Sequence, residues 1–306
     1  MTQTVLSIQH LQKHFGKFQA LSDITFDVNA GEVFGFIGPN GAGKSTTIRV
    51  LLGILKASGG QATIFNQDVW SQAVSIHNRI AYVPGDVYLW PNLTGGEMID
   101  FLLKLNHQKH TAKTDALIKE FELDPKKKSR TYSKGNRQKV ALIAAFSTEA
   151  DFYIFDEPTS GLDPLMEEIF QKHVLALKEN GKSVLLSSHI LSEVERMCDR
   201  IGIIKAGKIV ETGTLDEMRQ LTRTQITVAT QQPLDAVAQL AGVHGFTPDA
   251  TTANKATFAV DTAQVGAVMS QLADYQIVTL QSTPPTLEDL FMRYYNAEGE
   301  GDSHEA

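Results

Sequence analysis

The sequence predicts an α/β protein with a largely parallel sheet, followed by a smaller α+β module. Three observations lead to this prediction: short apolar segments alternate with helical patterns, a glycine-rich loop follows one of those segments, and the composition changes near residue 215. With 306 residues, the chain is long enough for about two domains. We therefore expect a first domain over residues 1–214, a second over 215–297 and a disordered tail over 298–306.

The first domain is expected to begin with strands, because apolar and polar residues alternate over 1–35. A short apolar strand at 33–37 runs into the glycine-rich loop 38–46, and a helix is expected over 47–55. The segment 86–130 is mostly helical in pattern. The remaining elements of this domain are a helix, a strand, a helix and a strand at 134–146, 152–155, 166–179 and 183–187.

The second domain is expected to alternate strands and helices over fewer than 90 residues, which predicts a small α+β module, ferredoxin-like in its order. Its strands are expected at 225–229, 256–260 and 276–280. Its helices are expected at 233–240, 263–272 and 286–295.

The composition is ordinary for a soluble globular protein, with 42% hydrophobic and 21% charged residues. The longest apolar run covers residues 140–146, far short of the ~20 apolar residues that a membrane-spanning helix requires. The first residues show no signal-peptide pattern. The single cysteine, Cys198, has no partner for an internal disulfide. These features indicate the cytosol or the cytoplasmic side of a membrane.

The net charge of −7 is unevenly distributed, with +1 over residues 1–214 and −8 over residues 215–306. An acidic segment repels a phosphate backbone, which argues against nucleic acid as a partner. One basic run covers 126–130, and it is either a solvated face or a contact for anionic headgroups.

Residues 38–46, GPNGAGKST, fit the pattern G-x-x-x-x-G-K-[ST] of a phosphate-binding loop. Glycines allow backbone N–H groups to surround the β- and γ-phosphates, and the loop leads into a helix N-terminus that favours anions. Lys44 would supply a cation to these phosphates, and the Ser45 hydroxyl would bind Mg²⁺. The loop residues expected to bind the nucleotide are Gly38, Asn40, Gly41, Gly43, Lys44, Ser45 and Thr46.

Two carboxylates follow the apolar strand expected at 152–155. Because strands of a parallel sheet end at the ligand crevice, Asp156 is placed to hold Mg²⁺ and Glu157 to orient and deprotonate a water. His189 follows another apolar strand and would sense the γ-phosphate at the same edge. Alone, such an acidic pair is usually a solvated turn and such a histidine a satisfied hydrogen-bonding group. The phosphate loop favours the functional interpretation.

Four segments in this order resemble the ATP-binding cassette of ABC transporters, over about residues 4–212: 38-GPNGAGKST-46, 132-YSKGNRQKV-140, 155-FDEPTSGLD-163 and His189. The resemblance implies a P-loop NTPase cassette with a RecA-like parallel-sheet core, an antiparallel β subdomain and a helical subdomain. It also implies ATP and Mg²⁺ as cofactors, and ATP hydrolysis coupled to transmembrane transport as the activity.

The resemblance assigns roles to single residues. Lys44 and Ser45 correspond to the phosphate-loop pair, and Asp156 to the acidic residue of the metal site. Glu157 corresponds to the general base and His189 to the switch histidine. Asp163 ends the segment that matches the family's D-loop. Phe15 stands where the family has an aromatic side chain that stacks on adenine. Considered alone, Phe15 would be a packed residue of an edge strand.

Residues 132–136, YSKGN, lie at the family's signature motif, whose usual form is Leu-Ser-Gly-Gly-Gln. Ser133 is expected to cap the following helix and to direct N–H groups at an anion. In the family this segment, here with Ser133 and Gly135, closes over the γ-phosphate held by the opposite subunit. One chain carries one loop and one signature, so a head-to-tail pair of cassettes is expected. Lys134 replaces a glycine and either adds a cation near the γ-phosphate or points into solvent.

A second departure lies in 82-YVPGD-86, where the family has a glutamine that touches Mg²⁺ and the membrane partner. Gly85 stands at that place. Asp86, the next residue, is the alternative oxygen ligand for Mg²⁺.

The resemblance implies a transporter, and this sequence shows no membrane span, so the pore is expected on another chain, an integral-membrane permease. The segment 87-VYLWP-91 either shapes the groove for a cytoplasmic helix of that permease or packs in the core. The ending 285-PTLEDLFMRYY-295 is similar to cassettes of ABC-2 exporters of drugs, polysaccharides or lipids. These features predict an exporter subunit, peripheral on the cytoplasmic face of the cell membrane.

Two alternatives remain open in the sequence. One is a soluble ABC-type ATPase that acts on ribosomes or DNA, although such relatives carry two cassettes or a long coiled coil. The other is a weakly active partner in a heterodimer. Glu157 and His189 speak against that second alternative, whereas Gly85 and Lys134 speak mildly for it.

Overall fold

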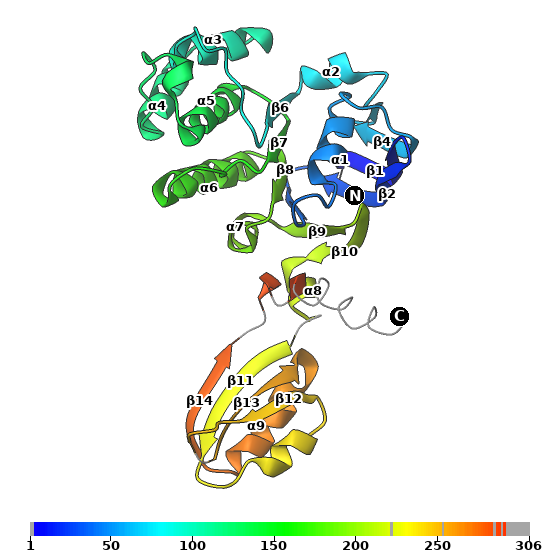
Figure 1. Ribbon diagram of the computed structural model, residues 1–306, viewed down its shortest axis with the longest axis vertical. Coiled ribbons are helices and arrows are strands. Elements are labelled where there is room, and N and C mark those ends of the chain that lie inside the picture. Colours follow the sequence, from blue (N-terminus) through cyan, green and yellow to red (C-terminus); the bar gives the residue numbers. More distant parts are fainter. Residues whose placement is uncertain (1–2, 221–222, 253, 284–285, 289, 292–306) are drawn as a thin grey trace. The chain divides into compact units, whose positions relative to one another are not determined.

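The computed structural model describes residues 3–220, 223–252, 254–283, 286–288 and 290–291. The chain divides into two compact units, Met1–Thr212 and Gly213–Ala306 (Figure 1). The helix expected at 286–295 lies largely outside the described residues, and the tail expected at 298–306 lies wholly outside them.

A ten-stranded sheet forms the centre of the first unit. Its strands are β1 (Thr4–Phe15), β2 (Phe18–Asn29), β3 (Val33–Ile37), β4 (Gly59–Ile64), β5 (Gln67–Asp68), β6 (Ile80–Val83), β7 (Phe152–Asp156), β8 (Ser183–Ser188), β9 (Arg200–Lys205) and β10 (Lys208–Thr214). Their order across the sheet is β5-β4-β1-β2-β10-β9-β3-β8-β7-β6.

Five strands at one end of this sheet, β9, β3, β8, β7 and β6, pair in parallel. The strands β3, β7 and β8 are buried along their whole length. This burial explains the apolar runs of β3 and β7 and the apolar centre of β8, residues 184–186, between its serines. At the other end, β1, β2, β4 and β5 pair antiparallel. The predicted combination of a parallel core and an antiparallel β subdomain is therefore confirmed.

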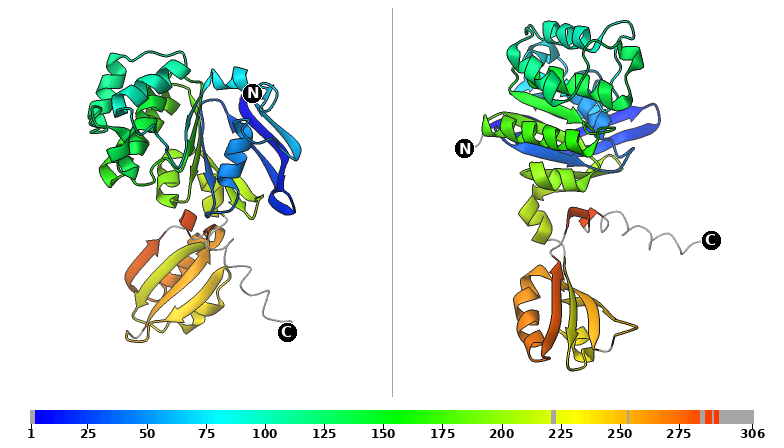
Figure 2. Two further views of the ribbon diagram at one scale, coloured as in Figure 1. Left: turned by 45° about the horizontal axis from the view of Figure 1, so that its top comes forward. Right: turned by 90° about the vertical axis from the view of Figure 1, so that its left-hand side faces the viewer.

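The helices of the first unit are α1 (Lys44–Leu51), α2 (Ala73–His77), α3 (Gly95–Leu105), α4 (Ala112–Glu120), α5 (Lys134–Ser147), α6 (Pro164–Glu179) and α7 (Leu191–Met197), with a 3₁₀ turn at Ser129–Thr131. Figures 1 and 2 show α3, α4 and α5 grouped together, away from β1, β2 and β4. This group is the predicted helical subdomain. Its helix α5 is buried from Gln138 to Ser147, which accounts for the apolar run of the sequence. Within the described part of the chain, no helix is both long and apolar enough to span a bilayer.

The second unit contains a four-stranded antiparallel sheet in the order β12-β13-β11-β14. Its elements are α8 (Leu215–Gln220), β11 (Arg223–Thr230), the 3₁₀ helix η2 (Asp235–Gln239), β12 (Val243–Pro248), β13 (Lys255–Asp261), the 3₁₀ turn η3 (Thr262–Gln264), α9 (Val265–Ala273) and β14 (Ile277–Thr283). From β11 onward, the strand–helix order is that of a ferredoxin-like fold, with its first helix reduced to 3₁₀ geometry. Alternate residues of β11 and β13, such as Ile226, Val228 and Phe258, form the core.

Two expectations for the second unit differ from the structure. The helix expected at 233–240 is the shorter 3₁₀ helix η2, and the strand β12 was not expected at all. The sequence of β12, VHGFTP, contains a glycine and a proline, which weaken a strand pattern. The strand forms nonetheless because it lies at the edge of the sheet, where a residue without an N–H group is tolerated.

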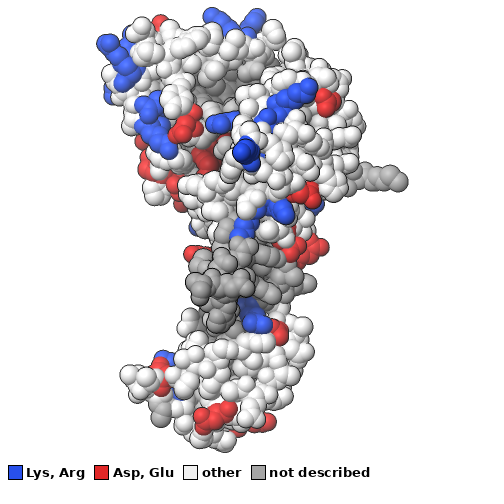
Figure 3. Space-filling model, turned by 45° about the vertical axis from the view of Figure 1, so that its right-hand side comes forward, with Lys and Arg blue, Asp and Glu red and all other residues white. Residues whose placement is uncertain are grey.

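The surface drawn in Figure 3 carries both Lys or Arg and Asp or Glu side chains over the first unit. This mixture agrees with the net charge of +1 over residues 1–214. On this face, neighbouring charges of opposite sign partly cancel, so the electrostatic field of the surface is weak at a distance.

Candidate active site

The phosphate loop connects β3 to α1, and close neighbours leave no room for a side chain at two of its glycines, Gly38 and Gly43. A Cβ atom at Gly38 would lie 2.5 Å from the carbonyl oxygen of Ile204. Gly43 has a φ of 115°, a conformation that residues with a side chain rarely adopt, and a Cβ there would lie 2.7 Å from a methyl carbon of Leu21. The loop is thus held tightly against the neighbouring strand and hairpin. The N-terminus of α1 follows it directly.

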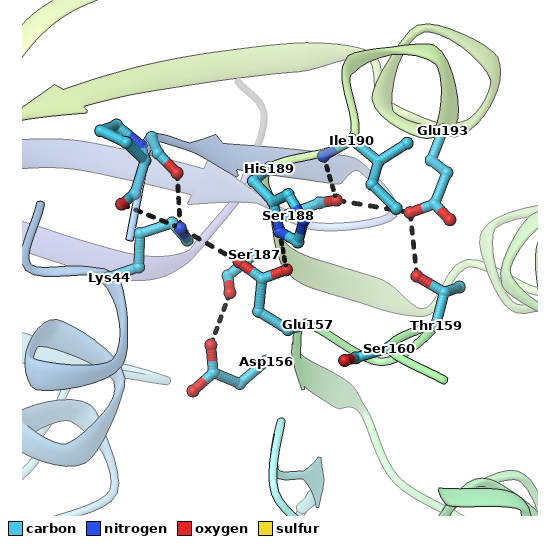
Figure 4. Close-up of polar contacts among 12 residues, drawn as sticks. Lys44, Asp156, Glu157, Thr159, Ser160, Ser187, Ser188, His189, Ile190 and Glu193 are labelled. Atoms are coloured by element: carbon cyan, nitrogen blue, oxygen red, sulfur yellow. Dashed lines mark hydrogen bonds and ion pairs between the residues drawn. The ribbon is translucent and has the colours of Figure 1, made fainter. Parts of the chain in front are cut away.

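Lys44 is 5% exposed and lies at the centre of the site (Figure 4). Its Nζ donates hydrogen bonds to the carbonyl oxygens of Gly38 and Pro39. The same Nζ lies 3.0 Å from Oε1 of Glu157 in an ion pair. A buried cation requires such partners, and its position in the loop makes it available to an anionic ligand.

Glu157 joins the phosphate loop to His189. Its Oε2 lies 2.5 Å from Nδ1 of His189, while its Oε1 faces Lys44. The backbone of Glu157 has a φ of 49° and donates a hydrogen bond to the carbonyl oxygen of Ser187. A left-handed conformation in a residue other than glycine costs about 1–2 kcal/mol, and such strain persists where surrounding contacts enforce it. The structure therefore brings the predicted base and the predicted histidine into direct contact.

Asp156 ends β7 and is 5% exposed. Its Oδ1 accepts a hydrogen bond of 2.6 Å from the Ser187 hydroxyl (Figure 4). Asp156, Ser45, Asp86 and Glu157 all line one polar pocket, so their oxygen atoms suit a hard cation such as Mg²⁺. Among the described residues, no group of three His, Cys, Asp or Glu side chains could hold a metal ion. The small set of oxygen donors in the pocket nevertheless fits Mg²⁺, because Mg²⁺ typically binds one or two carboxylates together with phosphate oxygens of a substrate.

Two adjoining pockets gather most of the predicted residues. The first is lined by Phe18, Ala20, Pro39, Asn40, Gly41, Gly43, Lys44, Ser45, Thr46 and Glu157. The second is lined by Asn40, Ser45, Arg49, Tyr82, Pro84, Gly85, Asp86, Tyr88, Lys134, Asp156, Glu157, Ser160 and His189. Burial, together with the charge of Asp156, raises the pKa of Tyr82 to about 12, so its phenol stays protonated in this pocket.

The aromatic residue in the first pocket is Phe18, at the start of β2, rather than Phe15 at the end of β1. Phe15 pairs with Phe18 across the hairpin, is 46% exposed, and lies under the Lys13 ammonium at 5.1 Å. Phe18 is 68% exposed. Phe18 was not among the predicted site residues. The two phenylalanines three residues apart are a sequence signal for an aromatic side chain at this place, but the signal does not show which of the two lines the pocket.

The signature segment begins α5. Ser133 caps the helix by accepting a hydrogen bond from the backbone N–H of Asn136, and it is exposed outside the two pockets. A Cβ at Gly135 would lie 2.4 Å from the carbonyl oxygen of Gly161, so these backbones touch. Lys134 Nζ donates a hydrogen bond of 2.7 Å to the Ser160 hydroxyl. The side chain of Lys134 therefore lies in the second pocket.

Gly85 and Asp86, which replace the expected glutamine, lie beside the acidic pair. A Cβ at Gly85 would lie 3.1 Å from the backbone oxygen of Asp156. Asp86 is largely exposed and lies 3.8 Å from Lys134 Nζ. Asp163 lines neither of the two pockets; its Oδ1 accepts from the Met166 N–H and caps α6.

Beside the site, an apolar groove lies between β6 and the helices α3 and α5. It is lined by Ala81, Tyr82, Pro84, Val87, Tyr88, Leu89, Met98, Leu102, Asn106, Ala141, Ala144, Ala145 and Thr148. Tyr88 is 91% exposed, whereas Trp90 packs on Phe101 with ring centroids 4.4 Å apart. Trp90 is itself 55% exposed, so both aromatic side chains of the segment 87–91 are accessible at the surface.

The strand, glycine loop and helix around a buried lysine define a P-loop nucleotide-binding protein. A family model described as ABC transporter matches residues 21–160. A second, described as the C-terminal domain of DrrA1-3-like ATP-binding proteins, matches residues 213–295. The chain belongs to the ATP-binding proteins of ABC transporters.

Characterised relatives and a solved structure support this family. The linearmycin resistance ATP-binding protein LnrL of Bacillus subtilis is 31% identical over 304 residues, which cover 94% of this chain and 97% of the relative. The daunorubicin resistance ATP-binding protein DrrA3 of Streptomyces coeruleorubidus is 32% identical and covers 81% of each chain. The structure of an ATP-binding subunit of an ABC transporter, 33% identical, superposes with a TM-score of 0.66 over 71% of this chain and 92% of that one.

Other relatives are longer than the matched region. The chain spans 58% and 62% of two ABC transporter ATP-binding proteins, from Synechocystis and Nostoc, that are 35% and 37% identical.

Proposed function

We propose that this chain binds and hydrolyses ATP and thereby powers the export of a drug-like compound through a separate membrane permease. The observation that carries the proposal is the position of Glu157, between Lys44 of the phosphate loop and His189. A carboxylate held in this way at the C-terminal edge of parallel strands is suited to deprotonate a water beside the γ-phosphate.

Each side chain has a separate task in this proposal. The loop N–H groups and Lys44 bind and neutralise the β- and γ-phosphates. The contact with Nδ1 of His189 fixes the orientation of the Glu157 carboxylate, which accepts the proton of the attacking water. Ser45 and Asp156, with Asp86 beside them, would hold Mg²⁺, which neutralises phosphate charge when bound.

Pairing with a second cassette completes the site in this proposal. Ser133 lies at the N-terminus of the 14-residue helix α5 and is exposed outside the pocket of its own chain. Helix N-termini favour anions, so a second copy placed head-to-tail would present this end to the γ-phosphate. We expect ATP to hold this dimer closed and hydrolysis to open it.

The surface and the relatives support the proposed transport partner and cargo. The exposed Tyr88 and the apolar groove beside it are suited to receive a short cytoplasmic helix of a permease. Two relatives are named for resistance to linearmycin and daunorubicin, which supports a drug-like cargo. The chain would then work at the cytoplasmic face of the cell membrane as a peripheral subunit.

Replacement of the proposed base tests the hydrolytic assignment. Glu157→Gln should lower ATP turnover by about 100-fold or more, because general-base catalysis contributes at least this factor. ATP affinity should persist, since Lys44 and the loop remain. Phosphate release and nucleotide binding by the purified chain measure the two quantities. Glu168→Gln, an exposed change on α6, is the matched control and should leave both unchanged.

The same variant tests pairing. With Mg²⁺ and ATP, Glu157→Gln should form a stable dimer that light scattering detects, because bound ATP is not consumed. Parental turnover in this variant would show that Glu157 is not the base. A monomer at saturating ATP would contradict the pairing. Copurification with ribosomes, in place of a membrane protein of several spans, would favour a soluble ATPase instead.

A further inference from the structure

Glu193 is a buried carboxyl group that the proposed hydrolytic mechanism does not use. It lies in the first turn of α7 and is 3% exposed. Its Oε2 accepts two hydrogen bonds, one of 3.1 Å from the Thr159 hydroxyl and one of 3.3 Å from the Ser188 hydroxyl (Figure 4). One oxygen atom therefore joins two segments that come from different strands.

Both segments lead directly to the proposed catalytic pair. Thr159 follows Glu157 by two residues, and Ser188 immediately precedes His189. The Ser188 hydroxyl also accepts a hydrogen bond of 2.9 Å from the Ile190 N–H, so its proton is directed at Glu193. The two hydroxyls and the carboxyl form a bridge behind the pair.

The burial of this carboxyl is costly for the fold. Removal from water raises the pKa of Glu193, and among the described residues its other oxygen, Oε1, has no hydrogen-bond partner. A carboxylate can stabilise a helix N-terminus while it remains exposed to water, so that role does not require burial. Such a partly satisfied buried group is typical of a functional constraint.

The pairing of β7 with β8 ends before Glu157 and His189, so it does not by itself fix the distance between these two side chains. The strands β7 and β8 pair up to Asp156 and Ser187, and Glu157 donates its N–H to Ser187. Beyond these residues β7 and β8 are no longer paired with each other. The bridge through Glu193 lies just past this point, where it can set the spacing of the loops.

We propose that Glu193 is a positioning residue for ATP hydrolysis. By holding Thr159 and Ser188 together, it keeps Oε2 of Glu157 in contact with Nδ1 of His189. The proposal rests on the proposed function of Glu157 as the base. Because Glu193 has no contact with the phosphate loop in the described structure, its effect falls on the turnover number and not on nucleotide affinity.

Two substitutions separate positioning from a general structural role. Glu193→Leu keeps a similar volume but removes both acceptors, and it should lower kcat by about tenfold or more while KM changes by no more than about twofold. Glu193→Gln keeps a carbonyl oxygen that can accept both hydrogen bonds, and it should restore kcat to within about threefold of the parent. Thr159→Val removes one hydrogen bond and should give an intermediate kcat.

The full-length chain with Mg²⁺ and ATP is the material for these measurements, with the parent and Glu157→Gln in the same assay. Parental kcat in Glu193→Leu would overturn the positioning role, as would an equal loss in Glu193→Leu and Glu193→Gln. Should Glu193→Leu unfold, Thr159→Val and Glu193→Gln decide the question through their kcat values. Full turnover in Glu157→Gln would instead overturn the proposed function itself, so the two failures are distinguishable.

Discussion

The interiors of the two units differ in kind. The first unit buries charged side chains, among them Lys44, Asp156 and Glu193. Among the described residues of the second unit, the buried polar side chains are the uncharged Thr224 and Thr230. Buried charges reduce stability unless they are paired, and proteins retain them where chemistry requires them. This difference supports the proposal that ATP is hydrolysed in the first unit.

The largest change in ATP affinity is expected at Lys44 of the first unit, and Lys255 of the second unit offers the matched control. Lys44→Ala should weaken ATP binding by about 100-fold, because it removes a charge-assisted contact to the phosphates. Lys255→Ala, which removes the partner of Asp249 in the second unit, should change ATP affinity by less than about twofold. Equilibrium titration with a fluorescent ATP analogue measures both. Comparable losses of ATP affinity in the two variants would contradict the assignment of nucleotide binding to the first unit.

A cavity in the second unit should alter stability without altering chemistry. Phe258 is 1% exposed and stacks on Phe246, with ring centroids 5.9 Å apart. Phe258→Ala should lower the free energy of unfolding of this unit by about 3–5 kcal/mol. Hydrogen exchange resolved along the chain would locate the loss, and ATP turnover should stay near the parental value. In contrast, Phe170→Ala in the first unit should lower turnover as well.

A smaller effect separates the two aromatic residues of the first hairpin. Phe18→Ala should weaken ATP binding by about 1–3 kcal/mol, the range measured for stacking of a base on an aromatic side chain, because Phe18 lines the pocket. Phe15→Ala should have the weaker effect. Affinities for ATP and for inorganic triphosphate, measured side by side, test whether the loss concerns the base. The reverse order of the two variants would assign stacking to Phe15.

The parts of the fold that could be predicted from the sequence are those with strong local patterns. The buried strands β3 and β7 are apolar runs, and β8 has an apolar centre at 184–186. The phosphate loop has a glycine spacing that the steric contacts at Gly38 and Gly43 require. The strand β12 escaped prediction because its pairing with β13, and not its own composition, stabilises it.

The candidate site shows the same distinction. Lys44, Glu157 and His189 stand directly after strands or in a motif, so their convergence could be expected. Glu193 could not be identified, because its importance depends on hydroxyl groups that meet it only in the folded chain. Phe15 and Phe18 stand on the two sides of one hairpin turn, and only the three-dimensional structure shows that Phe18 is the one that lines the pocket.

The contact between Gly135 and Gly161 has a mechanical consequence. Since a Cβ at Gly135 would lie 2.4 Å from the carbonyl oxygen of Gly161, the start of α5 rests directly on the turn that follows the acidic pair. Because no side chain separates the two backbones, we expect a displacement of this turn to move the start of α5 directly.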